Sequence, residues 1–282
     1  MDKEEFHIDI DKFIIQPKKM IGQGNTAEIF QLENNKILKL YRKGFSKYAI
    51  EREYKNSILV MKTLECVPKV YSKVCVGDRD GIVFQQINGT DMLKKMNSAI
   101  WKIKSYSKMF AKYHSQVLCP ISGDLQSVKE KLKQDIEWVM DLSDEEKRVI
   151  LIYMEDLPDG DELCHFDFYP GNIMLSSEGA YFIDWMNACR GDSCADIART
   201  CLLLTYGEMI HTSKFRRWMF SIIKRQIYKA YIKKYLIISG KKMEDILKWE
   251  LPVAAARLNE TLTDNERQTL TYHIKKLLYS LS

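Results

Sequence analysis

The sequence lacks several features that would place it in a specialised class of protein. It has no apolar run long enough to cross a bilayer, no internal repeat and no low-complexity segment. Its first residues, M-D-K-E-E-F-H, contain no basic stretch leading into an apolar one, so we expect no secretory signal. With 46% hydrophobic and 29% charged residues among 282, the composition is typical of a soluble globular protein with one or two domains.

Paired cysteines are also missing. The seven cysteines are odd in number, and none of them has C-x-x-C spacing. We therefore expect neither a disulfide framework nor a zinc site, and the pattern favours a reducing, cytoplasmic compartment.

The net charge of +5 is unevenly distributed. Residues 213–243 contain ten Lys or Arg and no acid, whereas Y-M-E-D-L-P-D-G-D-E-L at 153–163 is acidic. A basic run of this kind can bind nucleic acid or anionic lipid. Because apolar residues recur in it at near-helical spacing, we favour the solvated face of a helix, and expect neither a nucleic-acid nor a membrane partner.

The first ninety residues indicate a β-rich unit. Met20–Leu32 and Lys36–Tyr41 predict a hairpin that turns at Asn34-Asn35. Tyr48–Leu64 has the apolar stripe of an amphipathic helix, and two more strands are predicted over Pro68–Val76 and Gly81–Ile87.

Beyond Asn88-Gly89 the pattern is mainly helical, and Thr90 or Asp91 is the expected cap of the next helix. Helices are predicted at about 99–118, 124–141, 144–151, 195–206, 214–238, 243–258 and 264–281. The fold class is therefore α+β. We expect a small β-rich N-terminal lobe, residues 1–87, and a larger helical C-terminal lobe, residues 88–282, as in the two-lobed layout of kinases.

Two carboxylates and an amide come close together in the sequence from Leu163 to Trp185. H-F-D-F-Y-P-G-N-I-M-L carries Asp167 and Asn172 in a D-x-x-x-x-N spacing, and Asp184 closes the apolar run Y-F-I-D. Phosphoryl transfer needs a carboxylate to orient the attacking hydroxyl, and an amide and a carboxylate to hold Mg²⁺. An ordinary loop also contains Asp and Asn. The position of Asp184 at the end of a predicted strand favours the catalytic loop of a kinase.

A glycine-rich turn lies inside the first predicted hairpin. Its residues are Gly22, Gln23, Gly24, Asn25 and Thr26. Without side chains at the glycines, backbone N–H groups can approach phosphate oxygens closely. A dinucleotide-binding fold needs a helix directly after such a turn, and here a strand follows, so we reject it. A Walker-type motif is absent.

Lys39 lies in the apolar run I-L-K-L-Y. On strand evidence alone it would point outward from a half-exposed strand. Its position one hairpin after the glycine turn instead favours the lysine that neutralises the α- and β-phosphates in kinases. The next helix offers Glu51 and Glu53 as partners. We prefer Glu53, which lies beside the apolar stripe, and expect Glu51 to be solvated.

Asp196 and His165 have scaffold roles in our interpretation. Asp196 either caps the helix that begins near it or binds the catalytic loop. His165 precedes Phe166-Asp167, and a packed, hydrogen-bonded residue is favoured over a proton shuttle.

Taken together, these motifs resemble the aminoglycoside phosphotransferase and choline kinase family. The resemblance covers about Ile21 to Thr200 and rests on G-Q-G-N-T-A-E-I-F, I-L-K-L, E-R-E-Y, H-F-D-F-Y-P-G-N-I-M, F-I-D-W and G-D-x-x-x-D-I-A-R. It departs from the family at Phe166 and Tyr169, where a small residue and a histidine are common; both positions bear on the acceptor pocket. Protein kinases fit less well, because little room remains for an activation segment.

The resemblance implies the phosphorylation of a small-molecule hydroxyl by ATP or GTP, with Mg²⁺. Asp167 would be the catalytic base, Asn172 and Asp184 the metal ligands, Lys39 the phosphate contact and Glu53 its partner. The glycine turn would cover the phosphates. The backbone of Gln85, Gln86 and Ile87 would hold the adenine.

The acceptor is less defined by the sequence. The acidic segment 155–162, if close to the acceptor, favours a cationic amino sugar or amino alcohol, while a solvated loop is an equal alternative. A second function class is a nucleotide-binding scaffold of the same fold with little catalysis. Retention of every charged catalytic position favours the enzyme.

Overall fold

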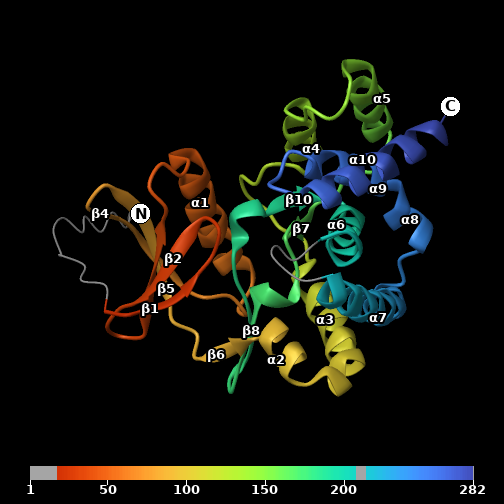
Figure 1. Ribbon diagram of the computed structural model, residues 1–282. Helices are drawn as coiled ribbons and strands as arrows, with labels where there is room; N and C mark the ends of the chain where they lie inside the picture. Colours follow the sequence, from red (N-terminus) through yellow and green to blue (C-terminus); the bar gives the residue numbers. More distant parts are fainter. Residues whose placement is uncertain (1–17, 208–213, 282) are drawn as a thin grey trace.

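The computed structural model describes residues 18–207 and 214–281, so the stretch M-D-K-E-E-F-H lies outside it. Its N-terminal part is an antiparallel five-stranded sheet with the order β1-β2-β3-β5-β4, and one long helix packs against it (Figure 1). The elements of this part are β1 (Met20–Gln23), β2 (Ala27–Gln31), β3 (Lys36–Tyr41), α1 (Lys47–Thr63), β4 (Val70–Val76) and β5 (Arg79–Gln85).

The predicted turn at Asn34-Asn35 joins β2 to β3. Both residues have left-handed backbone angles, with φ of 55° and 54°. That pair of angles defines the two-residue turn whose twist matches an antiparallel hairpin, and asparagine tolerates it better than most residues. The turn fixes the register that places Lys39 opposite Ile29 and Ile82.

The C-terminal part is mainly helical and contains two small sheets, β6-β8-β9 and β10-β7. Its elements up to β7 are β6 (Gly89–Asp91), α2 (Met92–Ser98), η1 (Ile100–Lys102), α3 (Ile103–Val117), α4 (Val128–Glu137), α5 (Asp144–Glu155) and β7 (Glu162–Cys164). The later elements are η2 (Pro170–Asn172), β8 (Ile173–Ser176), β9 (Gly179–Phe182), η3 (Trp185–Asn187), β10 (Cys189–Gly191), α6 (Ser193–Thr205), α7 (Lys214–Ser239), α8 (Met243–Lys248), α9 (Glu250–Arg257) and α10 (Asp264–Tyr279).

Helix α6 runs through the core of this part, between the small sheet β10-β7 and helices α7, α8 and α9 (Figure 1). Most of its residues are buried, including the polar Asp196, Arg199 and Thr200. Buried polar groups cost free energy unless they are hydrogen-bonded. Their presence on a core helix therefore points to partners that the helix has to hold.

Two predicted helices are divided in the structure. The helix expected at 99–118 is preceded by the separate helix α2, which Asp91 caps by accepting from Lys94 N at 2.8 Å, and by the 3₁₀ turn η1. The helix expected at 243–258 divides at Trp249. Pro252 accounts for that break, because its ring clashes with the carbonyl of residue 248 and it has no N–H to donate.

The chain passes from the first sheet to the second part just after β5. Strand β6 already pairs with β8 of the β8-β9 hairpin in the second part. We therefore propose that the boundary between the lobes lies near Ile87. In the described parts of the chain, no helix combines the length and apolar character that crossing a membrane requires.

Candidate active site

Asp196 binds the backbone of the loop that carries Asp167. The Asp196 carboxylate accepts from the backbone N–H of His165 at 2.6 Å and from that of Phe166 at 3.0 Å. Phe166 adopts a left-handed φ of 60°, which is unfavourable for a residue other than glycine. The two hydrogen bonds stabilise this turn, and thereby set the position of Asp167. Asp192, and not Asp196, is the N-cap of α6.

Two further residues of α6 bind the same loop. Arg199 Nε donates to the carbonyl of Phe166 at 3.3 Å, and Thr200 Oγ1 donates to the carbonyl of Phe168 at 3.0 Å. Arg199 also pairs with Glu260 at 2.5 Å. Arg199 and Thr200 were not predicted as site residues, although Arg199 closes the motif G-D-x-x-x-D-I-A-R. Its spacing of three residues from Asp196, one helical turn, was the available signal.

His165 is a buried part of the scaffold, as predicted. Its Nε2 lies 3.0 Å from the carbonyl of Ile183, and its Nδ1 accepts from the N–H of Asp167 at 3.3 Å. Burial lowers the pKa of His165, against the charge of Asp196. The ring is therefore neutral and connects the catalytic loop to the strand that precedes Asp184.

Asp167 has the electrostatic character of a general base. Burial raises its pKa to about 7; Arg199 opposes this rise and Asp184 adds to it. Asn172 Nδ2 donates to Asp167 Oδ2 at 3.3 Å and to its carbonyl at 3.0 Å. A carboxyl group that titrates near neutral pH is suited to accept a proton from a hydroxyl.

Lys39, Glu53 and Asp184 meet between the two lobes. Lys39 Nζ lies 2.5 Å from Glu53 Oε1 and 3.2 Å from Asp184 Oδ1, and Tyr41 donates to Glu53 Oε2 at 2.6 Å. Lys39 is only 8% exposed, so the outward-pointing alternative is wrong. Burial alone would lower the pKa of Lys39, but Asp184 and Glu53 outweigh it and raise that pKa. The amine therefore stays charged.

Asp184 begins the 3₁₀ turn η3 with a left-handed φ of 68°. Burial favours its neutral form, but Lys39 outweighs this and the pKa of Asp184 is lowered, so it is a carboxylate. The side chain of Asn56, on α1, donates to the carbonyls of Trp185 and Ala188, both at 3.2 Å, and of Met186 at 3.4 Å. Asn56 was not singled out from sequence. It lies one helical turn after Glu53, so α1 orients both the lysine and the segment behind Asp184.

The glycine turn connects β1 to β2, and Gly24 N donates to Ala27 O at 2.8 Å. Arg42, which follows β3, donates from its guanidinium to the carbonyls of Gly24 and Asn25, both at 3.0 Å. These bonds engage the carbonyls of the turn. The two Arg42 bonds hold the tip of the hairpin against β3 through carbonyls alone, whereas the N–H of Gly24 is already used within the turn.

The three residues expected to hold the adenine differ in their free backbone groups. The N–H of Gln85 donates to Lys69 O at 2.8 Å, and that of Gln86 donates to Asn35 O at 2.7 Å. Within the described residues, the N–H of Ile87 has no acceptor in the protein. Of the three amides, Ile87 is therefore the available donor.

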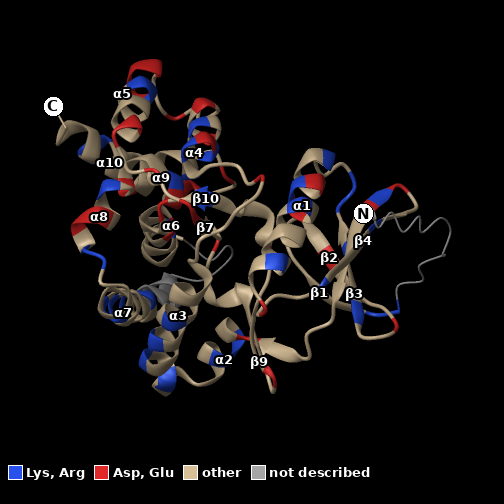
Figure 2. Ribbon diagram, turned by 180° about the vertical axis from the view of Figure 1, so that it is seen from behind, with Lys and Arg blue, Asp and Glu red and all other residues tan. Residues whose placement is uncertain are grey.

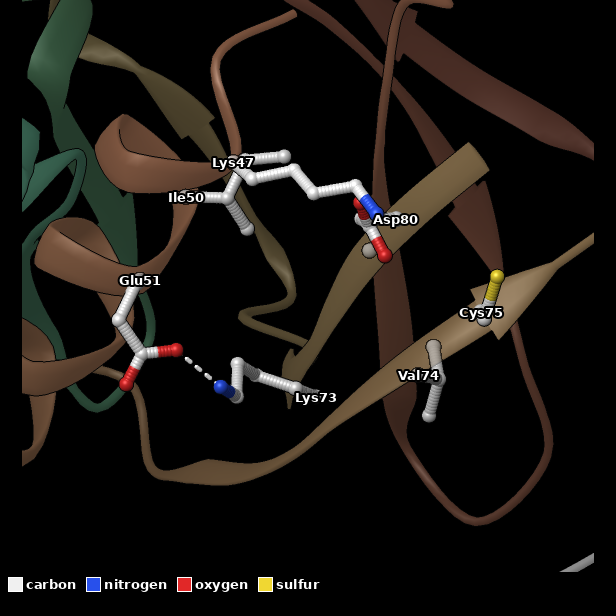
Figure 3. A pocket seen from close by; sticks show the side chains of 8 residues that line it. Lys47, Ile50, Glu51, Lys73, Val74, Cys75 and Asp80 are labelled. Atoms are coloured by element: carbon white, nitrogen blue, oxygen red, sulfur yellow. Dashed lines mark hydrogen bonds and ion pairs between the residues drawn. The ribbon is translucent and has the colours of Figure 1, made fainter. Parts of the chain in front are cut away.

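Glu51 faces away from this site, as the preference for Glu53 implied. It pairs with Lys73 of β4 at the wall of a cavity of about 310 Å³ between α1, β4 and β5 (Figure 3). Lys47 and Asp80 line the same cavity. Two cationic and two carboxylate side chains line the cavity, so its charges favour neither an anionic nor a cationic ligand.

The acidic segment 155–162 is held by basic residues of its own surroundings. Lys129 pairs with Asp159 at 3.1 Å, and Lys241 pairs with Glu162 at 3.2 Å. On the catalytic side, Phe166 lines a cavity of about 20 Å³, where Lys131, Asp135, Arg199, Arg257 and Glu260 also lie. The acids and bases of that cavity are paired with one another. Glu155, Asp156 and Asp161 are exposed and have no ion pair among the described residues, whereas the acids of the cavity at Phe166 are paired.

Tyr169 lies close enough to Asp167 and Asp184 for their charges to affect its pKa. Burial, together with the charges of Asp167, Asp184 and Asp91, raises its pKa to about 12. The ring lies over Gly171, where a Cβ atom would meet it at 2.3 Å. Its phenol remains protonated, and the residue is 36% exposed.

Part of the chain matches a known protein family. Residues 109–219 match the model of the phosphotransferase enzyme family. The matched range contains Asp167, Asn172, Asp184 and Asp196. The predicted family resemblance is confirmed. The match supports a phosphotransferase, and no curated protein matches the chain by sequence.

Solved structures share the fold. A choline/ethanolamine kinase family protein from Mesorhizobium loti superposes with a TM-score of 0.55 at 14% identity, covering 94% of this chain and 89% of that one. An aminoglycoside-3′-phosphotransferase of type VIII gives 0.54 at 13% identity, covering 87% and 94%. The ternary complex of APH(2″)-IIa with streptomycin and ATP gives 0.51 at 16% identity, covering 94% and 91%. The α+β, two-lobed fold class is therefore confirmed.

Proposed function

We propose that this protein is a kinase of small molecules, which transfers the γ-phosphate of ATP or GTP to a hydroxyl group. One observation carries the proposal. Lys39 and Glu53 form a buried ion pair that extends to the partly exposed Asp184, and Asp184 lies close enough to Asp167 to raise the pKa of Asp167. The charged parts needed for phosphoryl transfer thus come together from both lobes.

In this proposal Asp167 receives the proton of the acceptor hydroxyl. Its pKa of about 7 lets it be a carboxylate before transfer and a stable acid after it. Lys39 stays charged and contacts the nucleotide phosphates, while Glu53 and Tyr41 fix its position. Gly22–Thr26 cover the phosphates through backbone N–H groups, and Ile87 donates to the adenine.

The oxygen atoms near Asp167 fit a magnesium ion. The amide nitrogen of Asn172 is occupied by Asp167, which leaves the Asn172 amide oxygen as a ligand beside the carboxylate of Asp184. Carboxylate and amide oxygens are the ligands that Mg²⁺ prefers. Bound to the nucleotide, the ion would neutralise charge that develops on the phosphates. Across the described residues, no three His, Cys, Asp or Glu side chains group together, so the site relies on Asn172.

We further propose an amino sugar or an amino alcohol as the first acceptor class to test. Support comes from relatives of the same fold, one named for choline and ethanolamine and another bound to streptomycin. The paired charges around Phe166 offer no separate support.

The test is turnover of the nucleotide with a panel of amino sugars, amino alcohols and neutral or anionic alcohols. Asp167→Asn should lower acceptor-dependent ADP release by about a hundredfold to ten-thousandfold, because the base is lost while the fold is kept. Removal of Mg²⁺ by a chelator should abolish release.

Asp159→Asn is the control, because that carboxylate is 88% exposed and lies outside the catalytic group. Unchanged turnover in Asp167→Asn would exclude Asp167 as the base. Nucleotide binding without turnover of any acceptor would favour the scaffold alternative. Activity confined to neutral or anionic acceptors would reject the cationic class alone.

A further inference from the structure

A lysine-rich stretch without acids runs along one side of the C-terminal lobe. Between Asp91 and Asp124 the sequence has six lysines and no Asp or Glu. Their side chains are all exposed: Lys94, Lys95, Lys102, Lys104, Lys108 and Lys112. Of these six lysines, only Lys94 forms an ion pair within the described residues, with Asp91 at 2.8 Å. The other positive charges face solvent without compensation.

Helix α7 adds positive charge beside α3. The two helices pack through Phe110 and Tyr231, whose ring centroids are 4.8 Å apart, and Figure 2 shows basic residues along both. Arg225, Lys229 and Lys233 recur at every turn of α7 and are exposed. We call the exposed side chains of α2, η1, α3 and α7 the basic face.

Large apolar side chains protrude from one end of the basic face. Trp101 is 81% exposed, Ile100 is 51% exposed and Leu93 is 39% exposed. Trp101 and Ile100 are adjacent on the short turn η1, between Lys95 and Lys102. Neighbouring exposed apolar residues framed by lysines mark a contact surface more often than a solvated one.

We propose that the basic face binds the surface of an anionic lipid membrane. Lysines are attracted to acidic headgroups, and the amphipathic ring of tryptophan prefers the boundary between headgroups and acyl chains. A nucleic acid would also attract the lysines, but its phosphate backbone gives Ile100 and Leu93 no apolar layer to enter. This proposal goes beyond the solvated-face interpretation of the basic run, because α7 lies beside α3 and Trp101 is exposed.

Docking of this face would bring the catalytic loop close to the membrane surface. Helix α2 packs against η2, the turn that contains Asn172. Membrane binding does not depend on catalysis, however, so the two proposals fail separately.

The experiment uses the full chain and two kinds of vesicle, phosphatidylcholine alone and phosphatidylcholine mixed with phosphatidylserine. We expect sedimentation with the mixed vesicles only, and release as salt is added. Trp101→Ser and the double variant Lys104→Glu/Lys108→Glu should each weaken binding by about tenfold or more. Brominated lipid should quench the tryptophan fluorescence of the parent chain more than that of Trp101→Ser.

Helix α4 supplies matched controls. Trp138 is 75% exposed at its C-terminal end, and Lys133 is exposed on the same helix. Trp138→Ser and Lys133→Glu should bind mixed vesicles like the parent. Equal weakening in these controls, no binding to the mixed vesicles, or retention on duplex DNA in place of vesicles would each overturn the proposal. Thermal unfolding of every variant checks that the fold is intact.

Discussion

At the scale of single residues, Asp196 holds the loop of the candidate site in place, although we assign it no contact with a reacting atom. Its carboxylate accepts from two backbone N–H groups of the catalytic loop and lies 3.3 Å from His114 Nε2. His114 in turn bonds Tyr231 of α7 at 2.7 Å. A fully buried carboxylate with this many donors fixes the loop, since each donor would otherwise lose its partner.

We predict that Asp196→Asn destabilises the protein by about 2–4 kcal/mol, measured by urea unfolding at pH 7. The amide keeps one acceptor oxygen, but it turns an N–H₂ group toward backbone donors. Thr200→Val, which removes a single neutral hydrogen bond to the same loop, should cost about 1 kcal/mol. A loss from Asp196→Asn no larger than that from Thr200→Val would contradict the central role.

The destabilisation caused by Asp196→Asn should depend on pH. Burial alone would raise the pKa of Asp196, but His114 and the His165 backbone outweigh it and lower that pKa. The carboxylate therefore contributes stability above the unfolded pKa of about 3.9, and loses it as pH falls further. The stability gap between the parent and Asp196→Asn should narrow below about pH 4.

At the scale of elements, helix α1 has polar residues on the face that it buries. Glu53, Asn56 and Ser57 are all at most 5% exposed. Glu53 holds Lys39, and Asn56 holds the carbonyls of η3 behind Asp184. The helix therefore connects Lys39, the proposed phosphate contact, to the segment that follows Asp184, the proposed metal ligand.

Asn56→Ala should lower kcat by about tenfold or more and leave the KM for nucleotide less affected. Without the amide, η3 is free to shift, and small displacements of catalytic groups are costly. Ser57→Ala is the control from the next position. Its hydroxyl is buried and has no partner within the described residues, so its removal should be nearly neutral. Steady-state kinetics that are the same in both variants would rule out a positioning role for Asn56.

Elements with local signals were predictable from the sequence, whereas contacts across the fold were not. The hairpin at Asn34-Asn35 and the cap at Asp91 follow from turn and capping chemistry, and both are confirmed. Pro252 marked the break between α8 and α9 in the sequence, but the periodic pattern around it hid the signal. Asn56 and Glu260 meet their partners more than sixty residues away, and single-sequence periodicity carries no information on such pairings.

At the scale of the whole molecule, the two lobes are joined by polar contacts around the site, in addition to the apolar packing of Val60 and Val67 into the core of the C-terminal lobe. Lys39 comes from the first sheet and Asp184 from the catalytic hairpin, while Asn56 crosses from α1 to η3. Strand β6 joins the hairpin directly after the chain leaves β5. The groups that would bind the nucleotide are therefore also the groups that connect the lobes.

Lys39→Met should consequently affect stability and nucleotide binding together. It leaves Glu53 and Asp184 without their shared cation, so we expect a loss of about 3–5 kcal/mol in urea unfolding, as for other broken buried pairs. The double variant Lys39→Met/Glu53→Gln should recover part of that loss, because the buried charge is removed. ADP with Mg²⁺ should raise the melting temperature of the parent but not of either variant. Lys73→Met, at the exposed pair with Glu51 on the outer side of α1, should cost less than about 1 kcal/mol and keep the ADP response. If Lys39→Met and Lys73→Met destabilise the protein equally, the contact between Lys39 and Asp184 does not hold the lobes together.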